Sequence, residues 1–451
     1  MREGGLDAPT RHVVPWRDAD YTDTAKLDAE LRRVFDICHG CRRCFNLCDS
    51  FPRLFDLIDD SKTGELDSVD SAGFKAVVDA CTLCDMCFMI KCPYVPPHDF
   101  DLDFPHLMLR ARAAQAKAGK VGFAEKQLTK TDRNGRLCSH APGLTNWAGN
   151  RKNGLTRGVL QVAAGVHKDA ELPRYHGKTL LDRSDETLPL NAEAPAHGRK
   201  AVLYATCFSN FNNPGIGIAM RGILAKNGVE TEIVYPRCCG MPQMEHGDLA
   251  AVAESAAVVA DELGPWIAKG YDVVALVPSC ALMLKFEWPL IVPENAAVKS
   301  LAEATFDASE YIVDIAKKEG LADGLAALDE GVTLHLACHA RAQNMGQKAA
   351  ELMRLIPDAD LTVIERCSGH GGSWGLMKEN FEVGIKIGKP VARQALKAEK
   401  GIVASECPLA ATHILQGMER LDEAGRAPAR SLHPIELFAK AYGIAIESDA
   451  A

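Results

Sequence analysis

AVLYATC (residues 201–207) is the stretch that decides the fold, because a similar stretch, VTLHLAC (332–338), follows it later in the chain. Two more pairs occur in the same order: TEIVYPRCCG (231–240) with LTVIERCSG (361–369), and DVVALVPSC (272–280) with GIVASEC (401–407). Each is a short apolar run, rich in β-branched residues, that ends at or just before a cysteine, which is typical of a buried strand. The second half of the chain is therefore an internal repeat with an offset of about 130 residues.

Helical patterns separate these predicted strands, at residues 216–227 and 249–269 in the first copy and 342–355 and 382–398 in the second. Strands that alternate with helices favour a parallel sheet with right-handed crossovers, so each copy is predicted to be a βαβαβ lobe. Every cysteine then lies just beyond the carboxyl end of a strand, where open α/β sheets bind ligands. We expect one set of thiols to converge in each lobe: Cys207, Cys238, Cys239 and Cys280 in the first, and Cys338, Cys367 and Cys407 in the second.

The N-terminal region contains two further cysteine runs, CHGCRRCFNLC (38–48) and CTLCDMCFMIKCP (81–93). Two C-x2-C-x2-C runs, each followed by a fourth cysteine, closely match the two-cluster ferredoxin pattern, in which the fourth thiolate serves the other cluster. Structural zinc is the alternative, but a four-ligand zinc site would leave the third cysteine of each run unexplained. We therefore predict one [4Fe-4S] cluster on Cys38, Cys41, Cys44 and Cys92, and a second on Cys81, Cys84, Cys87 and Cys48.

The composition is that of an ordinary globular protein, with 451 residues of which 47% are hydrophobic and 25% are charged. No apolar run reaches the length of about 18 residues that a membrane-spanning helix needs. The N-terminus lacks the apolar core of a secretion signal, so we expect a cytoplasmic protein, either free or peripherally associated with the inner face of the membrane. In that compartment the 16 cysteines serve as metal ligands or redox groups rather than as disulfides. The net charge of −9 and the scattered basic residues argue against a nucleic-acid partner.

The pattern divides the chain into a helical ferredoxin-like domain over residues 1–133, a linker over 134–199, and lobes over 200–325 and 326–451. Helices are expected at residues 23–37 and 104–120, and as an insertion between the two N-terminal cysteine runs. The linker shows one modest helical stretch at 155–166, and its lone Cys138 is expected to be inert. No dinucleotide fingerprint is complete and no catalytic residue stands out, so organic redox chemistry would belong to another polypeptide.

The whole layout resembles the iron–sulfur subunit of anaerobic glycerol-3-phosphate dehydrogenase and the related heterodisulfide reductase-like oxidoreductases with cysteine-rich CCG domains. The resemblance rests on the duplicated C…CCG…C spacing and on the segments PSCALMLKFEWP (278–289) and CHARAQNMG (338–346). The complete family motif, C…CCG…CxxC, supplies five thiolates to a cluster. Here Met283 replaces the last of them in the first lobe, and Ser368 and Ala410 replace two in the second.

The resemblance implies a further iron–sulfur cluster on the four thiolates of the first lobe. The second lobe, with three thiolates, leaves the cofactor open. It could hold a cluster with an open or non-cysteine fourth ligand, for which His339 and His370 are close enough in sequence, or another metal or a haem. It could equally be a decayed repeat whose cysteines pack as small hydrophobic side chains. We expect His335, on its strand, to be a core residue, and His413 to be a packed or surface residue.

We predict an iron–sulfur electron-transfer subunit, because eight well-spaced ligands occur without substrate chemistry of their own. Electrons would enter from a flavoprotein or another redox subunit and pass through the two [4Fe-4S] clusters and the cysteine-rich lobes to a quinone or another carrier. One alternative is a heterodisulfide reductase-like thiol/disulfide enzyme, although the missing fifth cysteine counts against it. A second alternative is an iron–sulfur redox sensor.

Overall fold

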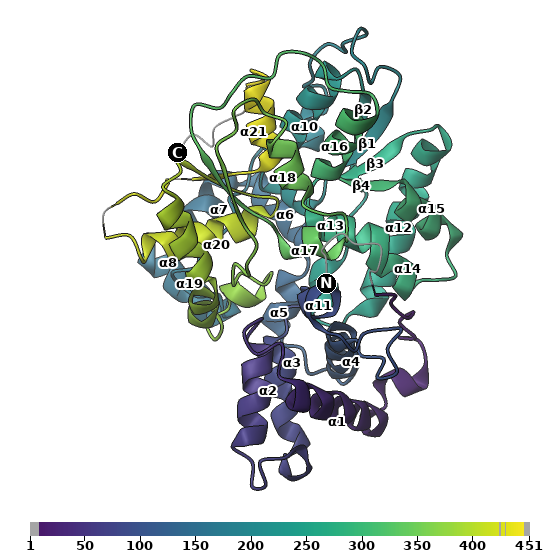
Figure 1. Cartoon of the computed structure of the whole chain (residues 1–451), viewed down its shortest axis with the longest axis vertical. Coiled ribbons are helices and arrows are strands. Elements are labelled where there is room, and N and C mark those ends of the chain that lie inside the picture. Colours follow the sequence, from purple (N-terminus) through teal and green to yellow (C-terminus); the bar gives the residue numbers. More distant parts are fainter. Residues whose placement is uncertain (1–8, 424, 429, 446–451) are drawn as a thin grey trace.

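The N-terminal module is built from helices that pack around aromatic side chains. We describe it from a computed structural model of the chain, which covers residues 9–423, 425–428 and 430–445 (Figure 1). The rings of Phe35 and Phe51 lie 6.1 and 4.7 Å from that of Phe104, between centroids. The helices of the module are α1 (Thr24–Cys41), α2 (Ser50–Asp59), α3 (Phe74–Ala80) and α4 (Phe104–Lys117).

Both helices expected in this region are present, but α1 does not end before the first cysteine. It continues through Cys38 to Cys41, because the amide of Arg42 still donates to the carbonyl of Cys38 at 2.8 Å. Arg42 then takes the left-handed conformation, with φ of 50°, and ends the helix. The first two cysteines are therefore presented by the last turn of a helix rather than by a loop.

Two four-stranded parallel sheets form the repeated half. The first contains β1 (Lys200–Tyr204), β2 (Glu230–Val234), β3 (Asp272–Ala275) and β4 (Thr305–Asp307), in the order β2-β1-β3-β4. The second contains β5 (Val332–His335), β6 (Leu361–Ile364), β7 (Ile402–Ser405) and β8 (Ser431–Leu432), in the equivalent order β6-β5-β7-β8. The predicted fold class, with two repeated parallel-sheet lobes, is confirmed. Each lobe has one strand more than expected, since β4 and β8 are too short to give a periodic sequence pattern.

The helices of the lobes mostly follow the predicted pattern. In the first lobe they are α9 (Cys207–Phe211), α10 (Pro214–Lys226), α11 (Met241–Glu245), α12 (Leu249–Ala268), α13 (Pro278–Leu282), α14 (Trp288–Ile291), α15 (Ala296–Ala304) and α16 (Ala308–Lys318). In the second they are α17 (Cys338–Ala342), α18 (Lys348–Met353), α19 (Phe381–Ala398), α20 (Pro408–Glu419) and α21 (Pro434–Ala441). The single helix predicted over 342–355 is wrong, because Asn344 and Gly346 have positive φ and separate α17 from α18.

The segment between the module and the lobes has more structure than its sequence suggested. It carries α6 (Thr131–His140), α7 (Pro142–Gly149) and α8 (Gly154–Ala164), preceded by α5 (Phe123–Leu128). The fully buried guanidinium of Arg157, on α8, donates to the carbonyl oxygens of Gly149, His167, Lys168 and Ala170 at 2.7–3.1 Å. One charged side chain thus fixes the loops at both ends of α8.

This connecting segment also joins the two lobes. The amide of His167 donates to the carbonyl of Leu376 in the second lobe at 2.8 Å. In the first lobe, the Asn212 side chain donates to the carbonyl of Arg174 at 2.8 Å. The segment therefore contacts both lobes and forms part of the wall between them.

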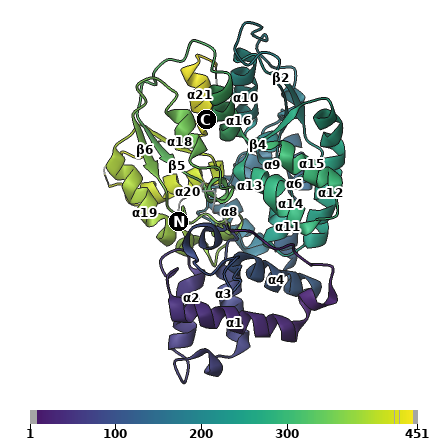
Figure 2. The same ribbon diagram turned by 45° about the vertical axis from the view of Figure 1, so that its right-hand side comes forward.

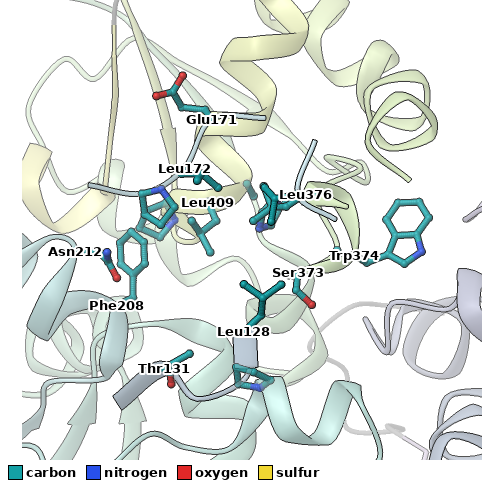
Figure 3. Close-up of a pocket in the computed structure, with 18 of the residues that line it drawn as sticks. Leu128, Thr131, Glu171, Leu172, Phe208, Asn212, Ser373, Trp374, Leu376 and Leu409 are labelled. Carbon is teal, nitrogen blue, oxygen red and sulfur yellow. The ribbon is translucent and has the colours of Figure 1, made fainter. Parts of the chain in front are cut away.

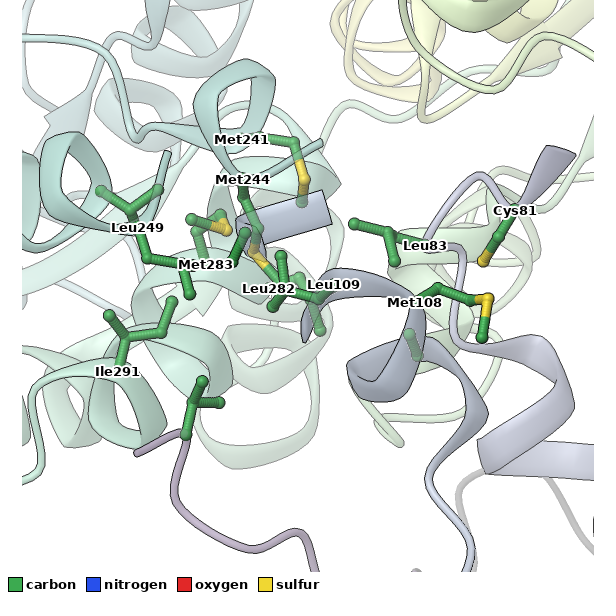
Figure 4. Packing of buried hydrophobic residues seen from close by; sticks show 14 of the residues in the cluster. Cys81, Leu83, Met108, Leu109, Met241, Met244, Leu249, Leu282, Met283 and Ile291 are labelled. Carbon is green, nitrogen blue, oxygen red and sulfur yellow. The ribbon is translucent and has the colours of Figure 1, made fainter. Parts of the chain in front are cut away.

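Two large apolar cores hold the parts together. One core is shared by the N-terminal module and the first lobe, where Met108 and Leu109 of α4 pack near Met244 and Leu282 (Figure 4). The other is shared by the two lobes through α10, α16, α18 and α21. Figure 2 shows the result: the two lobes stand side by side and the N-terminal module lies beneath both.

Among the residues that the structure describes, no helix combines the length and apolar character that crossing a bilayer requires.

Candidate functional site

The first set of N-terminal thiols lines one small cradle. Cys38 and Cys41 come from the end of α1, Cys44 from the turn after it, and Cys92 from the chain after a single π-helical turn over Cys87–Lys91. Phe51, Phe55, Tyr94 and Leu102 close the cradle, and Arg43 contributes its only charged side chain among the lining residues. The structure thus brings together the four cysteines that the sequence assigned to one cluster.

The second set lies deeper in the module. Cys81 caps the C-terminus of α3, and the following loop reaches Cys84 and Cys87 through two residues with positive φ, Leu83 (49°) and Asp85 (63°). Cys48 comes from the other run but lies in the electrostatic field of Cys84 and Cys81. The chain therefore crosses over between the two sets, as the spacing of the sequence predicted.

The thiols of both sets are in surroundings that suit neutral thiols or a bound cation, but not free thiolates. Burial, and then the fields of Cys92 and Cys41, raise the pKa of Cys44 to about 12. Burial also raises the pKa of Cys81, to about 11. A metal that binds here must displace protons, and its positive charge would remove the repulsion between the thiolates.

The separation of these thiols fits a cluster better than one ion. Within the described ranges, no three His, Cys, Asp or Glu side chains are grouped as the ligands of a single metal ion. A [4Fe-4S] cluster takes its four thiolates on four different iron atoms, so that its ligands stand farther apart. The donor set and the cradle therefore fit the group that the spacing predicted.

The thiols of the first lobe converge at the carboxyl ends of β1, β2 and β3. The sulfur atoms of Cys207 and Cys238 are 3.8 Å apart, and those of Cys239 and Cys280 are 3.2 Å apart. The hydrogen bond with its neighbour Cys207 is the largest effect that lowers the pKa of the Cys238 thiol. Asp132, on α6, accepts from the amide of Cys238 at 3.1 Å and so ties the connecting segment to this site.

The three thiols of the second lobe follow the central strands β6, β5 and β7. His335, at the end of β5, connects these strand ends: its ring nitrogens lie 2.9 Å from the Ser405 hydroxyl and 2.9 Å from the Arg366 carbonyl. Ser405 and Arg366 come just before Cys407 and Cys367, so this buried imidazole holds the approaches to both cysteines. The expectation that His335 is a core residue is confirmed.

The second lobe also meets the N-terminal module. The Cys338 thiol makes a hydrogen bond with the Cys84 thiol, and this bond is the main effect that lowers the pKa of Cys84. Burial, and then the nearby Cys84 thiol, raise the pKa of Cys367 to about 11. Cys338 and Cys367 therefore lie beside the second N-terminal set, which the sequence gave no means of predicting.

The positions where this chain departs from the five-thiolate motif are filled by buried side chains. Met283 is fully buried, and Ser368 and Ala410 are 4% and 5% exposed. None of the three is a thiolate donor.

The histidines considered for the second lobe differ in their surroundings. His339 has its Nε2 3.3 Å from the Leu83 carbonyl, whereas neither ring nitrogen of His370 has a partner among the described residues. His413 is buried and packs against the ring of Phe381. Only His370 therefore has both ring nitrogens available to a ligand within the part of the chain that the structure describes.

A single cavity of about 1630 Å³ connects these sites. Figure 3 shows Phe208 of the first lobe, Leu376 and Leu409 of the second, and Leu172 of the connecting segment around it. The cysteines that line it come from every part of the chain: Cys48, Cys84, Cys138, Cys207, Cys238, Cys239, Cys280, Cys338, Cys367 and Cys407. Its remaining lining is mainly apolar, so the cavity suits a lipophilic molecule next to several thiol sites.

Sequence reasoning missed the part of this cavity that the connecting segment builds. Leu144, Trp147, Leu155 and Val159 line the cavity and are at the same time 66%, 58%, 79% and 63% exposed. They therefore lie where the cavity opens to the surface. Their apolar character at helical spacing, between residues 134 and 199, is the signal that could have revealed them.

Comparison with known proteins agrees with the repeat and with the position of the thiols. The model of the CCG cysteine-rich domain matches the chain twice, over residues 201–285 and 332–414. This chain contains two CCG domains. The matches cover the first and second lobes from β1 to the helix region after Cys280, and from β5 to α20.

The relatives of the two CCG domains include named components of oxidoreductases. One component of the anaerobic glycerol-3-phosphate dehydrogenase of Escherichia coli (strain K12), its C chain, is 25% identical over 349 residues, which span 76% of this chain and 82% of that protein. One component of the fumarate reductase (CoM/CoB) of Methanothermobacter marburgensis, its B chain, is 24% identical over 54% of this chain and 47% of its own length. Lactate utilization protein A of Bacillus pumilus is 28% identical over 39% of this chain and 75% of its own length.

Proposed function

We propose that this protein is an iron–sulfur electron-transfer subunit that receives electrons from a flavoprotein-type dehydrogenase subunit and delivers them to a quinone. The observation that carries the proposal is the common cavity, which three of the four thiol sets line. The similarity to components of a dehydrogenase and of a reductase supports a role beside a second, substrate-binding polypeptide.

In this proposal the N-terminal thiols hold two [4Fe-4S] clusters, on Cys38, Cys41, Cys44 and Cys92 and on Cys48, Cys81, Cys84 and Cys87. Bound clusters supply reversible one-electron reduction, whose potential depends on burial and on nearby charges. The four thiols of the first CCG domain are proposed to hold a further cluster. The chain itself provides the shielding, since Cys81, Cys87, Cys238, Cys239 and Cys280 are all buried.

The thiol sets are arranged as a continuous series, which supports a relay. Cys87 of the second set lies in the field of Cys44 of the first set. Cys84, also of the second set, forms a hydrogen bond with Cys338 of the second CCG domain. Each step of the proposed path thus joins neighbouring sites, and the last sites open into the cavity.

The lining of the cavity favours a quinone as the acceptor. Leu155 and Val159 give its mouth an apolar rim, which a carrier with an isoprenoid tail would enter more readily than a polar one. Reduction of a quinone also consumes protons, and burial raises the pKa of Glu245 in the cavity wall to about 7. The Glu245 carboxyl is therefore suited to give up a proton at neutral pH.

The same rim suits peripheral contact with a membrane. Leu144, Trp147, Leu155 and Val159 form the exposed apolar rim of α7 and α8, to which we refer as the apolar rim. Contact with the bilayer through this rim would place the cavity mouth where quinones are dissolved. Tryptophan is frequent at the membrane interface, which fits the exposed position of Trp147.

Reoxidation of the reduced protein in stopped-flow experiments tests the acceptor. We expect the fully assembled protein, reduced with dithionite, to be reoxidised at least about tenfold faster by a long-tailed menaquinone analogue in liposomes than Val159→Glu protein is. The matched control is Val258→Glu on α12, whose side chain is 41% exposed but does not line the cavity. Equal rates in all three proteins would contradict the quinone site.

A further inference from the structure

His370 is the buried imidazole in the second CCG domain for which the fold provides no partner. Its side chain lines the cavity and is 5% exposed, and neither ring nitrogen has a hydrogen-bond partner among the described residues. A buried polar group in this situation is costly unless a ligand satisfies it. Its Nδ1 and Nε2 atoms therefore indicate that something binds in this part of the cavity.

The turn that carries His370 begins at a cysteine and is held close to the second sheet. The amide of Gly369 donates to the Cys367 sulfur at 3.4 Å, and the amide of Gly375 donates to the His370 carbonyl at 2.9 Å. The ring of His370 is 5.8 Å, between centroids, from the ring of His413 on α20, the helix that Cys407 caps. His370 thus lies between the Cys367 turn and the start of α20.

Comparison of the two CCG domains shows what His370 replaces. CCGM (238–241) in the first domain aligns with CSGH (367–370) in the second. The second domain therefore lacks a thiolate at Ser368, and two positions later it has an imidazole where the first domain has Met241. Gly240 and Gly369 have nearly the same positive φ, 84° and 78°, so the two turns share one backbone conformation. Loss of a thiolate and gain of an imidazole occur in the same turn.

We infer that His370 is the fourth ligand, with Cys338, Cys367 and Cys407, of an iron–sulfur cluster in the second CCG domain. The inference rests on the proposed function, since it assumes that the other thiol sets hold clusters. Imidazole is a known replacement for thiolate at iron–sulfur clusters, where it raises the reduction potential because the cluster carries less negative charge. Such a cluster beside Cys84 would accept electrons readily from the second N-terminal set.

Nitrogen hyperfine coupling tests this ligand directly. We expect pulsed EPR of the reduced protein to show a strongly coupled histidine nitrogen that changes with ¹⁵N-histidine labelling and is lost in His370→Gln. The matched control is His339→Gln, which removes the other candidate from the same domain and should leave the coupling in place. A coupling that persists in His370→Gln, or disappears in His339→Gln, would overturn the inference.

A thiolate at the same position provides a second readout if His370→Gln simply loses the cluster. In His370→Cys the cluster should persist without nitrogen coupling, and its midpoint potential should shift downward because the added thiolate brings negative charge. A cluster without nitrogen coupling in the wild type, or zinc at these residues, would overturn the inference. The proposed function would survive either result, provided that the signals of the two N-terminal clusters are present.

Discussion

The thiol of Cys84 in the N-terminal module forms a hydrogen bond with the thiol of Cys338 in the second CCG domain. Each belongs to a different thiol set, and the two sets were predicted from unrelated motifs. Because of this contact, the module and the domain meet through their proposed ligands rather than through ordinary surface residues. A relay that ends in the lobes would begin its last step here.

The crossed ligation of the two N-terminal clusters can be tested by pairs of variants. Cys48→Ser and Cys81→Ser should lose the same EPR signal and about four iron atoms each, because both thiols belong to the second set. Cys38→Ser and Cys92→Ser should lose the other signal. If Cys48→Ser affected the same signal as Cys38→Ser instead, ligation would follow the sequence runs and the crossed arrangement would be wrong.

Removal of Arg11 should destabilise the contact between the module and the first lobe. Its guanidinium, with 11% of the side chain exposed, pairs with Asp85, Asp103 and Glu287 at 2.7–2.9 Å. Arg11→Met would leave buried carboxylates without their partner, so the free energy of unfolding should fall by about 3–5 kcal/mol.

The control for this change is Arg17→Met. Arg17 also pairs with a carboxylate, Glu294, but both side chains are more than half exposed, 54% and 61%. Its loss should cost less than about 1 kcal/mol in thermal or denaturant unfolding. Similar losses in both variants would mean that burial of the Arg11 cluster has no special weight.

His106 should make stability depend on pH in the neutral to alkaline range. Burial and Arg11 lower its pKa, but Asp103 and Glu287 outweigh them, and the net pKa lies above the usual 6.5. The charged form is thus stabilised by folding, so its contribution is complete below about pH 6.5 and is lost as pH rises through the raised pKa. The unfolding temperature of the wild type should therefore fall more steeply above about pH 6.5 than that of His106→Gln. Parallel curves would contradict this.

Gly369→Ala should disrupt the turn of the second CCG domain. A Cβ at Gly369 would lie 2.0 Å from the carbonyl oxygen of Gly384, and the residue has φ of 78°. We expect lower stability, by more than about 1 kcal/mol, and loss of any metal from the second domain. Gly264→Ala in α12, where a Cβ would meet nothing within 4 Å, should be neutral or slightly stabilising.

Membrane contact through the apolar rim predicts a clear result in liposome flotation. The wild-type protein should float with vesicles, whereas Leu155→Glu should remain in the soluble fraction because a charge replaces a 79% exposed apolar side chain. Val258→Glu should float as the wild type does. Flotation of Leu155→Glu to the same extent would show that α7 and α8 are not the contact.

The sequence was sufficient for the repeat but not for how its parts meet. The strands that lead to Cys207 and Cys338 were predictable because each is a continuous apolar run of several residues. Strands β4 and β8 were missed because three and two residues carry no pattern. The bond between Cys84 and Cys338 depends on packing between elements far apart in the chain, which no local pattern encodes.

The connecting segment shows the same limit. Its scattered Gly, Pro and Asn residues indicate loops, but these loops separate short helices that Arg157 and its four carbonyl partners hold in place. Likewise His339 and His370 were equivalent candidates in sequence. Only the fold distinguishes them, since the ring of one lies against the Leu83 carbonyl and that of the other lines the cavity without a partner among the described residues.

The central claim is that the eight N-terminal thiols hold two [4Fe-4S] clusters, and metal analysis combined with an EPR-monitored redox titration tests it most directly. Anaerobically purified protein should contain at least about eight iron atoms with matching sulfide, and reduction should produce two interacting paramagnetic signals that titrate separately. Zinc as the sole metal, or disulfides among those eight cysteines in place of iron, would contradict the account.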